Sequence, residues 1–289
     1  YAMKAHWNEH PDRDEKWAEA ERARIGEERF RREHECEFLI FDETLINSIT
    51  LADMEGVPPV ETTGQVRWYK RPTPGHTYLV SLDPSMGTGG DFAAIQVFEL
   101  PTFEQVGEWH HNMTPMNQQV RILQGINKHI NDTILEKDST ATPQIFYSME
   151  NNTIGEAALM RVMDIGEENI MGMFLSEPIR KGHRRKFRRG FNTTAKFKID
   201  ACTKFKELVE SGKMKISSQL LISELKDFVA SGLSYKAKPG QHDDLVSACL
   251  LMTRMMKVLA DFDPKIFEKW TDRSSELTTP MPIFGNFYG

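Results

Sequence analysis

The sequence predicts an α/β fold: a mixed sheet in which three antiparallel strands precede parallel strands, with helices flanking it. Apolar runs of strand length alternate with longer segments whose apolar residues recur at helical spacing. Only Pro101 and Thr102 separate two of the early runs, which is typical of a hairpin, whereas later runs stand a helix length apart, as parallel strands require. With 289 residues, of which 39% are hydrophobic, the chain can fill one core of ordinary size.

The first half of this fold consists of three expected strands and a helix. The strands cover residues 77–83, 92–100 and 103–109. The helix covers residues 116–135. Five aliphatic residues recur there at helical spacing, namely Val120, Leu123, Ile126, Ile130 and Ile134. A helix at this place is the crossover that allows the next strand to run parallel to the first.

The second half continues as alternating strands and helices. We expect a strand at 144–150, a helix at 155–163, a strand at 171–175, a helix at 194–211, a short apolar run at 214–216 and a buried helix at 245–259. Pro239 and Gly240 form a turn before this last helix. Three strands, a helix, a strand, a helix, a strand and a helix follow one another in the order of a ribonuclease H-like fold.

Three acidic residues lie where these elements end or begin. Asp83 ends the first strand, before a glycine-rich loop, Glu150 ends the fourth, and Asp244 marks the start of the last helix. Two such charges about 4 Å apart repel by roughly 4 kcal/mol at an effective dielectric of about 20, and a divalent cation removes that cost. Magnesium prefers oxygen ligands, and a pair of ions can activate water and stabilise the leaving oxygen of a phosphodiester. The three acids therefore predict metal-dependent hydrolysis of nucleic acid.

Each acid also has an ordinary structural interpretation. Taken alone, Asp83 or Glu150 is typical of a solvated group at a strand end. Asp243 is a plausible helix N-cap, and Asp244 is an acid that the helix dipole favours in the first turn. The joint arrangement favours a metal site, while the choice between Asp243 and Asp244 as the third ligand stays open.

Four segments together resemble a known family. They are LDPSMGTGGD at 82–91, MENNT at 149–153, GQHDDLV at 240–246 and FRREHECEF at 30–38. The first three are similar to the places of three acids, and the fourth is similar to a stretch that links an ATPase to a nuclease. With these segments the chain, over residues 6–260, resembles the nuclease domain of the large terminase subunit of tailed bacteriophages.

The resemblance implies an endonuclease that cuts concatemeric double-stranded viral DNA during genome packaging, with little sequence specificity. We expect two Mg²⁺ or Mn²⁺ ions at Asp83, Glu150 and Asp244, with Asp243 also near the metal. His242 and Asp91 are expected to orient the ligands. The implied partners are double-stranded DNA, the portal, the small terminase subunit and the ATPase domain of the full-length protein. The implied location is the host cell cytoplasm, transiently at the capsid portal and not in the mature virion.

Other classes of protein fit the same residues. A junction resolvase or a transposase of the ribonuclease H-like kind would use the same acids on branched DNA or in joining ends. A DNA-binding module without activity would bind duplex and leave it uncut. A structural docking domain would do neither.

The domain organisation follows from composition along the chain. Residues 1–75 are expected to form a charged helix, over 14–32, and a linker at the edge of a missing N-terminal ATPase domain. Residues 76–262 form the nuclease domain, and 263–289 a proline-containing tail. A phosphate-binding ATPase loop is not expected in this chain, because Met214 follows the dipeptide Gly212-Lys213 where the motif requires serine or threonine.

A block of positive charge stands out against the net charge of −6. Residues 180–189 contain seven lysines and arginines and no acid, which suits sequence-independent contact with phosphates. The alternative interpretation is a solvated loop between Gly182 and Gly190. The expected DNA contacts are Arg184, Arg185, Lys186, Arg188, Arg189 and Lys196.

Cysteine usage and hydropathy exclude several other classes. The three cysteines are widely spaced, which argues against a disulfide framework, and no Cys-x-x-Cys pair supports a zinc site. No apolar run approaches the length of a membrane span, and the chain lacks the pattern of a signal peptide. A soluble, intracellular protein without a membrane partner is expected.

Overall fold

A mixed seven-stranded sheet forms the centre of the protein in a computed structural model, which describes residues 6–35, 43–178 and 189–262. The strand order is β1-β2-β5-β4-β3-β6-β7. The strands are β1 (Glu61–Thr63), β2 (Val66–Trp68), β3 (Thr77–Asp83), β4 (Ala93–Leu100), β5 (Glu104–His111), β6 (Gln144–Met149) and β7 (Met173–Phe174). β4 pairs antiparallel with β3 on one side and with β5 on the other, whereas β6 pairs parallel to β3 and β7 parallel to β6. The expected α/β fold with its mixed sheet is confirmed.

The register of the central strands brings two acids to one edge. Asp83 pairs with Ala94 of β4, and Leu82 pairs with Met149 of β6. The backbone N–H of Glu150 donates to the carbonyl of Leu82 at 3.1 Å. Because β3 and β6 are parallel neighbours, their carboxyl ends meet, and Asp83 and Glu150 therefore end adjacent strands.

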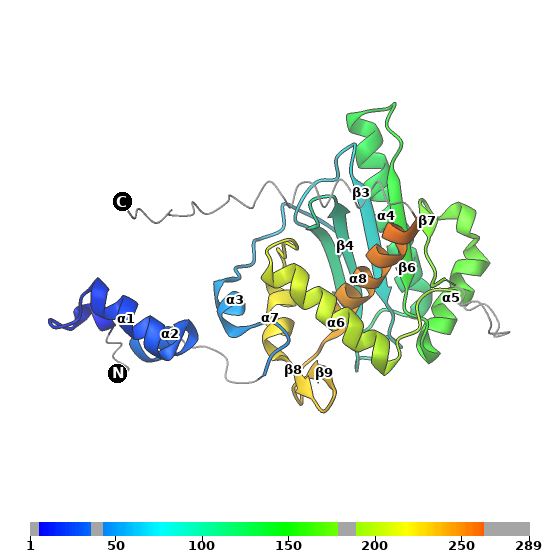
Figure 1. The fold of residues 1–289 in the computed structure, drawn as a ribbon. Helices are drawn as coiled ribbons and strands as arrows, with labels where there is room; N and C mark the ends of the chain where they lie inside the picture. The colour runs from blue at the N-terminus through cyan, green and yellow to red at the C-terminus, as the bar shows by residue number, and fades with distance from the viewer. Residues whose placement is uncertain (1–5, 36–42, 179–188, 263–289) are drawn as a thin grey trace, which may run out of the picture.

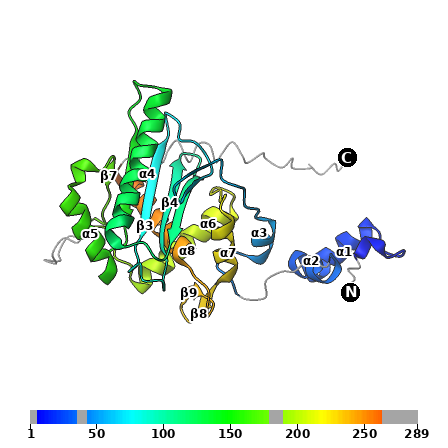
Figure 2. The same ribbon diagram turned by 180° about the vertical axis from the view of Figure 1, so that it is seen from behind.

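Helices cover both faces of this sheet. Figure 1 shows α6 (Ala195–Glu210) and α8 (Asp244–Phe262) on one face, and Figure 2 shows α4 (Met116–Lys137) and α5 (Thr153–Ile165) on the other. The side chains of β3 alternate between the two layers: Leu79 packs with the α6 and α8 layer, and Tyr78 and Val80 pack with the α4 and α5 layer. This is why nearly every residue of β3 and β4 is buried, and why their sequences do not alternate regularly between apolar and polar residues.

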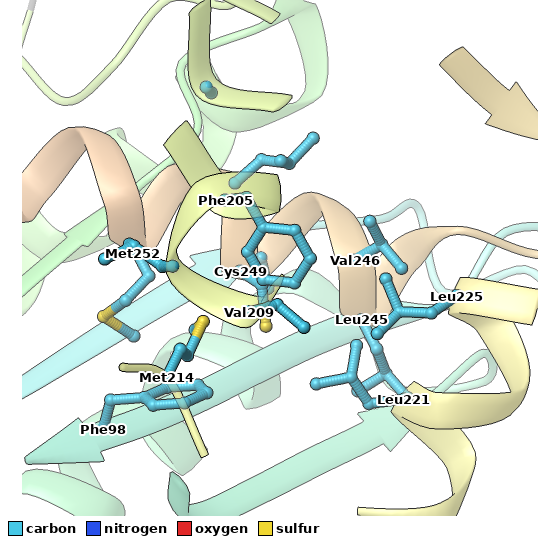
Figure 3. Close-up of a cluster of buried hydrophobic side chains, with 14 of the residues drawn as sticks. Phe98, Phe205, Val209, Met214, Leu221, Leu225, Leu245, Val246, Cys249 and Met252 are labelled. Atoms are coloured by element: carbon cyan, nitrogen blue, oxygen red, sulfur yellow. The ribbon is translucent and has the colours of Figure 1, made fainter. Parts of the chain in front are cut away.

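The apolar core on the α8 face fixes the start of that helix against the sheet. Figure 3 shows Phe98 of β4 with Phe205 of α6 and Leu245 of α8, all fully buried. A buried hydrogen bond adds to this packing, because the hydroxyl of Ser81 in β3 donates to the carbonyl of Ala248 at 2.8 Å. Helix α8 is thus held directly over the strand that carries Asp83.

The N-terminal segment differs from the single helix expected over residues 14–32. The structure has two helices, α1 (Glu15–Ile25) and α2 (Glu27–His34), after a short 3₁₀ turn, η1 (Trp7–Glu9). They are separated by Gly26, whose φ of 85° lies outside helical values and favours glycine. These helices pack around a small apolar cluster of their own, formed by Trp7, Ala18 and Phe30.

The segment expected to be a linker contributes to the sheet. β1 and β2 form a hairpin, and β2 pairs with β5, so the hairpin extends the sheet at one edge. Before it, α3 (Ser48–Asp53) contacts α7 (Gln219–Asp227). Residues 61–68 therefore belong to the sheet, while the expected tail at 263–289 lies outside the described residues.

Several short elements were not predicted from the sequence. Residues 214–216 form no strand, although Lys215 makes an isolated bridge to Glu104. They lead into α7 and a separate hairpin of β8 (Phe228–Ser231) and β9 (Ser234–Ala237). The strand expected at 171–175 is reduced to the two residues of β7, after a 3₁₀ turn, η2 (Glu167–Asn169).

In the described ranges, the search for a helix long and apolar enough to cross a membrane finds none.

Candidate active site

A cleft with a volume of about 310 Å³ opens at the edge of the sheet where β3 and β6 end. Its lining is rich in acids and contains all three sequence-predicted ligands as well as Asp243 and Asp91. The lining residues are Asp83, Pro84, Ser85, Asp91, Phe92, Glu150, Asn152, Ile154, Gly155, Asp243, Asp244 and Ser247. Asp83 and Asp244, which are 161 positions apart in the sequence, therefore share one cleft.

Asp83 lies at the base of the acidic cluster, at the last position of β3. Burial raises the pKa of its carboxyl group well above the usual range, and the neighbouring Glu150 adds to the rise through its charge and a hydrogen bond. The charges of Asp244 and Asp243 act in the same direction. A carboxylate in this position is stabilised by a cation and destabilised by its present neighbours.

Glu150 is positioned by contacts on both sides of its backbone. It bonds to Leu82 of β3, as described above, and it forms an isolated parallel bridge with Phe191. Gly155, in the first turn of α5, is essential to this geometry. A Cβ atom there would lie 1.9 Å from the carbonyl oxygen of Glu150, so only glycine lets α5 begin this close to the strand.

Asp243 and Asp244 occupy different environments at the start of α8. Asp243 immediately precedes the helix, and its Oδ2 lies 3.7 Å from Nζ of Lys198 on α6. Asp244 is the first helical residue, and its buried Oδ2 has no hydrogen-bond partner. Burial raises the pKa of Asp244 to about 6, helped by Asp243 and opposed by His242 and the backbone N–H of Phe92.

The two residues expected to orient the ligands lie at the rim. Asp91 is exposed and lines the cleft. His242 is also exposed, and its Nδ1 lies 3.5 Å from Oδ2 of Asp244, while its ring meets Phe92 edge to face at 4.8 Å. Both stand close to Asp244, where they can influence its orientation.

The donor set fits a magnesium-like ion. All the acids of the cleft offer oxygen, the ligand that Mg²⁺ and Mn²⁺ prefer. The unpaired Oδ2 of Asp244 and the raised pKa of Asp83 are both expected where a cation would complete the site. No group of three or more His, Cys, Asp or Glu side chains already placed to hold a metal ion is found among the described residues. Mg²⁺ does not need one, because it usually keeps several waters and takes only one or two carboxylates.

Some residues of the cleft were missed by the sequence analysis. Asn152 is the N-cap residue of α5, yet its side chain makes no capping hydrogen bond, and Ile154 and Gly155 bring the positive end of that helix to the cleft. An Asn-Asn-Thr sequence directly after a strand is a recognisable signal for a helix start. Ser85 and Ser247 also line the cleft, and nothing in their local sequence distinguishes them.

The loop after Asp83 is fixed by one side chain of α4. The amide of the fully buried Gln119 accepts the N–H of Ser85 at 3.2 Å and donates to its carbonyl at 2.9 Å. The same amide donates to the carbonyl of Thr114 at 2.7 Å. The wall of the cleft next to Asp83 is therefore held by a buried hydrogen-bond network.

The structure describes only two of the expected DNA contacts. Lys196 is exposed in the first turn of α6. Arg189 is half-buried, and its guanidinium group pairs with Glu167. The other four contacts lie outside the described residues: Arg184, Arg185, Lys186 and Arg188.

The fold is that of a ribonuclease H-like domain, and residues 80–255, which include all the residues that line the cleft, match the family described as the terminase RNaseH-like domain. The chain belongs to this family.

Solved structures support the fold. The chain resembles the large terminase nuclease from the thermophilic phage G20c with 18% sequence identity and a TM-score of 0.52, covering 72% of this chain and 96% of that chain. The same nuclease with bound magnesium and with bound cobalt gives 16% identity and a TM-score of 0.53 in each case. Those two matches each cover 73% of this chain and 96% of the other.

The raised pKa of Asp244 predicts a stability effect in the metal-free protein. A carboxyl group whose folded pKa of about 6 exceeds its ordinary 3.8 contributes stability below pH 3.8 that is lost as the pH rises through about 6. Asp244→Asn should therefore raise the free energy of unfolding at pH 8 by up to about 3 kcal/mol, and the gain should vanish near pH 4. Urea denaturation in EDTA at both pH values measures this. An equal effect at the two pH values would contradict it.

Proposed function

We propose that this chain is a divalent-metal-dependent endonuclease that cuts concatemeric double-stranded viral DNA during genome packaging, with little sequence specificity. The main support for this proposal is that Asp83, Glu150 and Asp244 line one cleft. Asp83 ends β3, Glu150 follows β6, and Asp244 begins α8. Membership of the terminase RNaseH-like family supports the proposal, as do the magnesium and cobalt bound in similar nucleases.

In this proposal Asp83, Glu150 and Asp244 hold two Mg²⁺ or Mn²⁺ ions. When bound, such ions supply an activated water and stabilise the leaving oxygen of the phosphodiester. Asp83 is the central ligand, because it is buried and because Glu150, Asp244 and Asp243 all add to the rise of its pKa. Asp244 contributes its unpaired Oδ2, whereas Asp243, beside Lys198, adds charge near the site. His242 and Asp91 orient Asp244 and its surroundings from the rim.

The substrate is proposed to lie across the cleft through phosphate contacts. Lys196 lies in the first turn of α6, and the basic block that includes Arg184, Arg185, Lys186 and Arg188 precedes that helix in the sequence. Contacts to phosphates alone give binding without base readout and with a strong dependence on salt. Arg189 is the weakest of these contacts, because its guanidinium group already pairs with Glu167.

The cellular setting is proposed from the family. The ATPase domain of the full-length protein, the small terminase subunit and the portal are the proposed partners. The proposed location is the host cytoplasm, transiently at the capsid portal, with the protein absent from the mature virion.

Neutralising the central acid tests the activity. Asp83→Asn should reduce Mg²⁺- or Mn²⁺-dependent cleavage of plasmid DNA by at least about a hundredfold, because it removes a carboxylate that would hold the metal ions. Circular dichroism should show an unchanged fold, and gel-shift assays in Ca²⁺ should show retained DNA binding. Substantial residual cutting would contradict the assignment. Preferential cutting of four-way junctions over linear duplex would instead indicate a resolvase.

A pair of variants distinguishes the two aspartates at the start of α8. Asp244→Asn should abolish cleavage to the same degree as Asp83→Asn, because its buried Oδ2 has no hydrogen-bond partner and is left to hold a metal ion. Asp243→Asn should retain measurable cleavage, because that carboxylate lies at the helix cap beside Lys198. Cleavage rates of both variants under identical Mn²⁺ concentrations measure the difference. The reverse order of activity would make Asp243 the ligand.

A further inference from the structure

Glu224, an acid outside the cleft, is buried against the start of α8. It lies on α7, a helix that carries none of the residues lining the cleft, and only 9% of its surface is exposed. Its Oε2 accepts the backbone N–H of Val246 at 3.0 Å, two residues after Asp244. The first N–H groups of a helix have no partner within the helix, so a side chain from elsewhere can satisfy them.

The cap of α8 is therefore supplied from another helix. Asp243, the residue before the helix, accepts the N–H of Ser247 through its backbone carbonyl, and its side chain faces Lys198. Glu224 does for Val246 what an N-cap side chain ordinarily does. Because α7 and α8 also pack together through Leu221, Leu225 and Leu245, the position of Glu224 relative to the helix start is fixed (Figure 3).

A chain of contacts continues from Glu224 to the other side of Asp244. Oε1 of Glu224 lies 3.7 Å from Nε2 of His110 on β5, and that buried nitrogen has no hydrogen-bond partner. The His110 ring stacks on Phe92 at 4.1 Å. The backbone N–H of Phe92 in turn donates to the Asp244 carboxylate. Glu224 is thus connected to Asp244 by two routes. One is the backbone of α8 at Val246, and the other passes through His110 and Phe92.

We propose that Glu224 is a positioning residue for the metal site, which sets the place of Asp244 by capping α8 from behind. This rests on the proposed function. Groups that hold a metal ligand in place typically contribute 10- to 100-fold to metal affinity, about the effect expected here. Glu224 itself does not line the cleft, so it acts only through the backbone of α8 and through His110.

The requirement is for a hydrogen-bond acceptor of this length, not for a charge. Burial raises the pKa of Glu224 to about 8, with the nearby Asp244 and Asp243 acting in the same direction. Glutamine has the same shape and an amide oxygen that can accept from Val246. Leucine has a similar volume and no acceptor, and aspartate is one methylene too short to reach.

The test measures Mn²⁺ binding by isothermal titration calorimetry, in the absence of DNA. Glu224→Leu should weaken Mn²⁺ binding by about 10- to 100-fold, and Glu224→Gln should stay close to wild type. Glu224→Asp should weaken Mn²⁺ binding as much as the leucine variant does. It replaces the leucine variant in this test if that variant does not fold. Thermal unfolding in EDTA establishes that each titrated variant is folded.

The matched control is Glu99→Leu. Glu99 is likewise a buried carboxylate, bonded to Lys70 and Thr102, but it pairs with Tyr78 near the opposite end of β3. Its loss should lower the unfolding temperature while leaving Mn²⁺ affinity unchanged. A general effect of destabilisation on metal binding would instead weaken the affinity in this variant as well, and would overturn the proposal.

The remaining outcomes separate this proposal from the proposed function. If wild type binds Mn²⁺ and Asp83→Asn does not, while Glu224→Leu or Glu224→Asp binds as tightly as wild type, the role of Glu224 is refuted and the metal site stands. The same conclusion follows if Glu224→Gln is as impaired as the leucine variant. If the wild type does not bind Mn²⁺, or if Asp83→Asn binds it as tightly as the wild type, the proposed metal site is refuted. The Glu224 proposal is then refuted with it.

Discussion

The carboxyl groups of Asp83 and Glu150 share a hydrogen bond at the edge of the sheet, and Asp244 and Asp243 approach them from α8. Like charges this close destabilise the folded chain unless a proton or a cation lies between them. Burial is the main cause of the raised pKa values of Asp83 and Asp244, and this repulsion adds to both. The protein tolerates it in a cleft open to solvent, where a divalent ion can enter, and the rest of the fold holds the acids in place against it.

That support comes from the pairing of the central strands and from the packing of α8 on them. β3 and β6 pair along six consecutive residues, which fixes Asp83 relative to Glu150. Helix α8 is fixed by its apolar face and by the hydrogen bond from Ser81 to Ala248. Because the two supports meet on the same strand, a shift of α8 would move Asp244 relative to both other acids. Metal sites on helices and strands are held more accurately than sites on loops, which suits chemistry that depends on ligand geometry.

The sequence predicted the parts of the site that local pattern determines. Asp83 and Glu150 follow apolar runs that could only be strands, and parallel pairing brings such ends together. Asp243 and Asp244 could not be distinguished, because the difference between them is tertiary: one faces Lys198, and the other has a buried carboxylate oxygen without a hydrogen-bond partner. Helix α7 was missed for a related reason. It is nine residues long, and its place is determined by packing on α8.

The residues that position the acids were the least visible in the sequence. Gly155 is an ordinary glycine by pattern, and only the carbonyl of Glu150 beside it shows why a larger residue cannot stand there. From the sequence alone, Glu224 is typical of a surface acid on an amphipathic helix. Only the structure shows that it accepts the N–H of Val246. Such roles depend on contacts between segments that are distant in the sequence. The local spacing of apolar and polar residues in a single sequence does not reveal these contacts.

The most direct measurement is the anomalous scattering of Mn²⁺ soaked into crystals of this protein. The account predicts strong peaks between the carboxylates of Asp83, Glu150 and Asp244, with Oδ2 of Asp244 turned toward an ion. Peaks at other acids with none in this cleft, or an empty cleft at millimolar Mn²⁺, would contradict it.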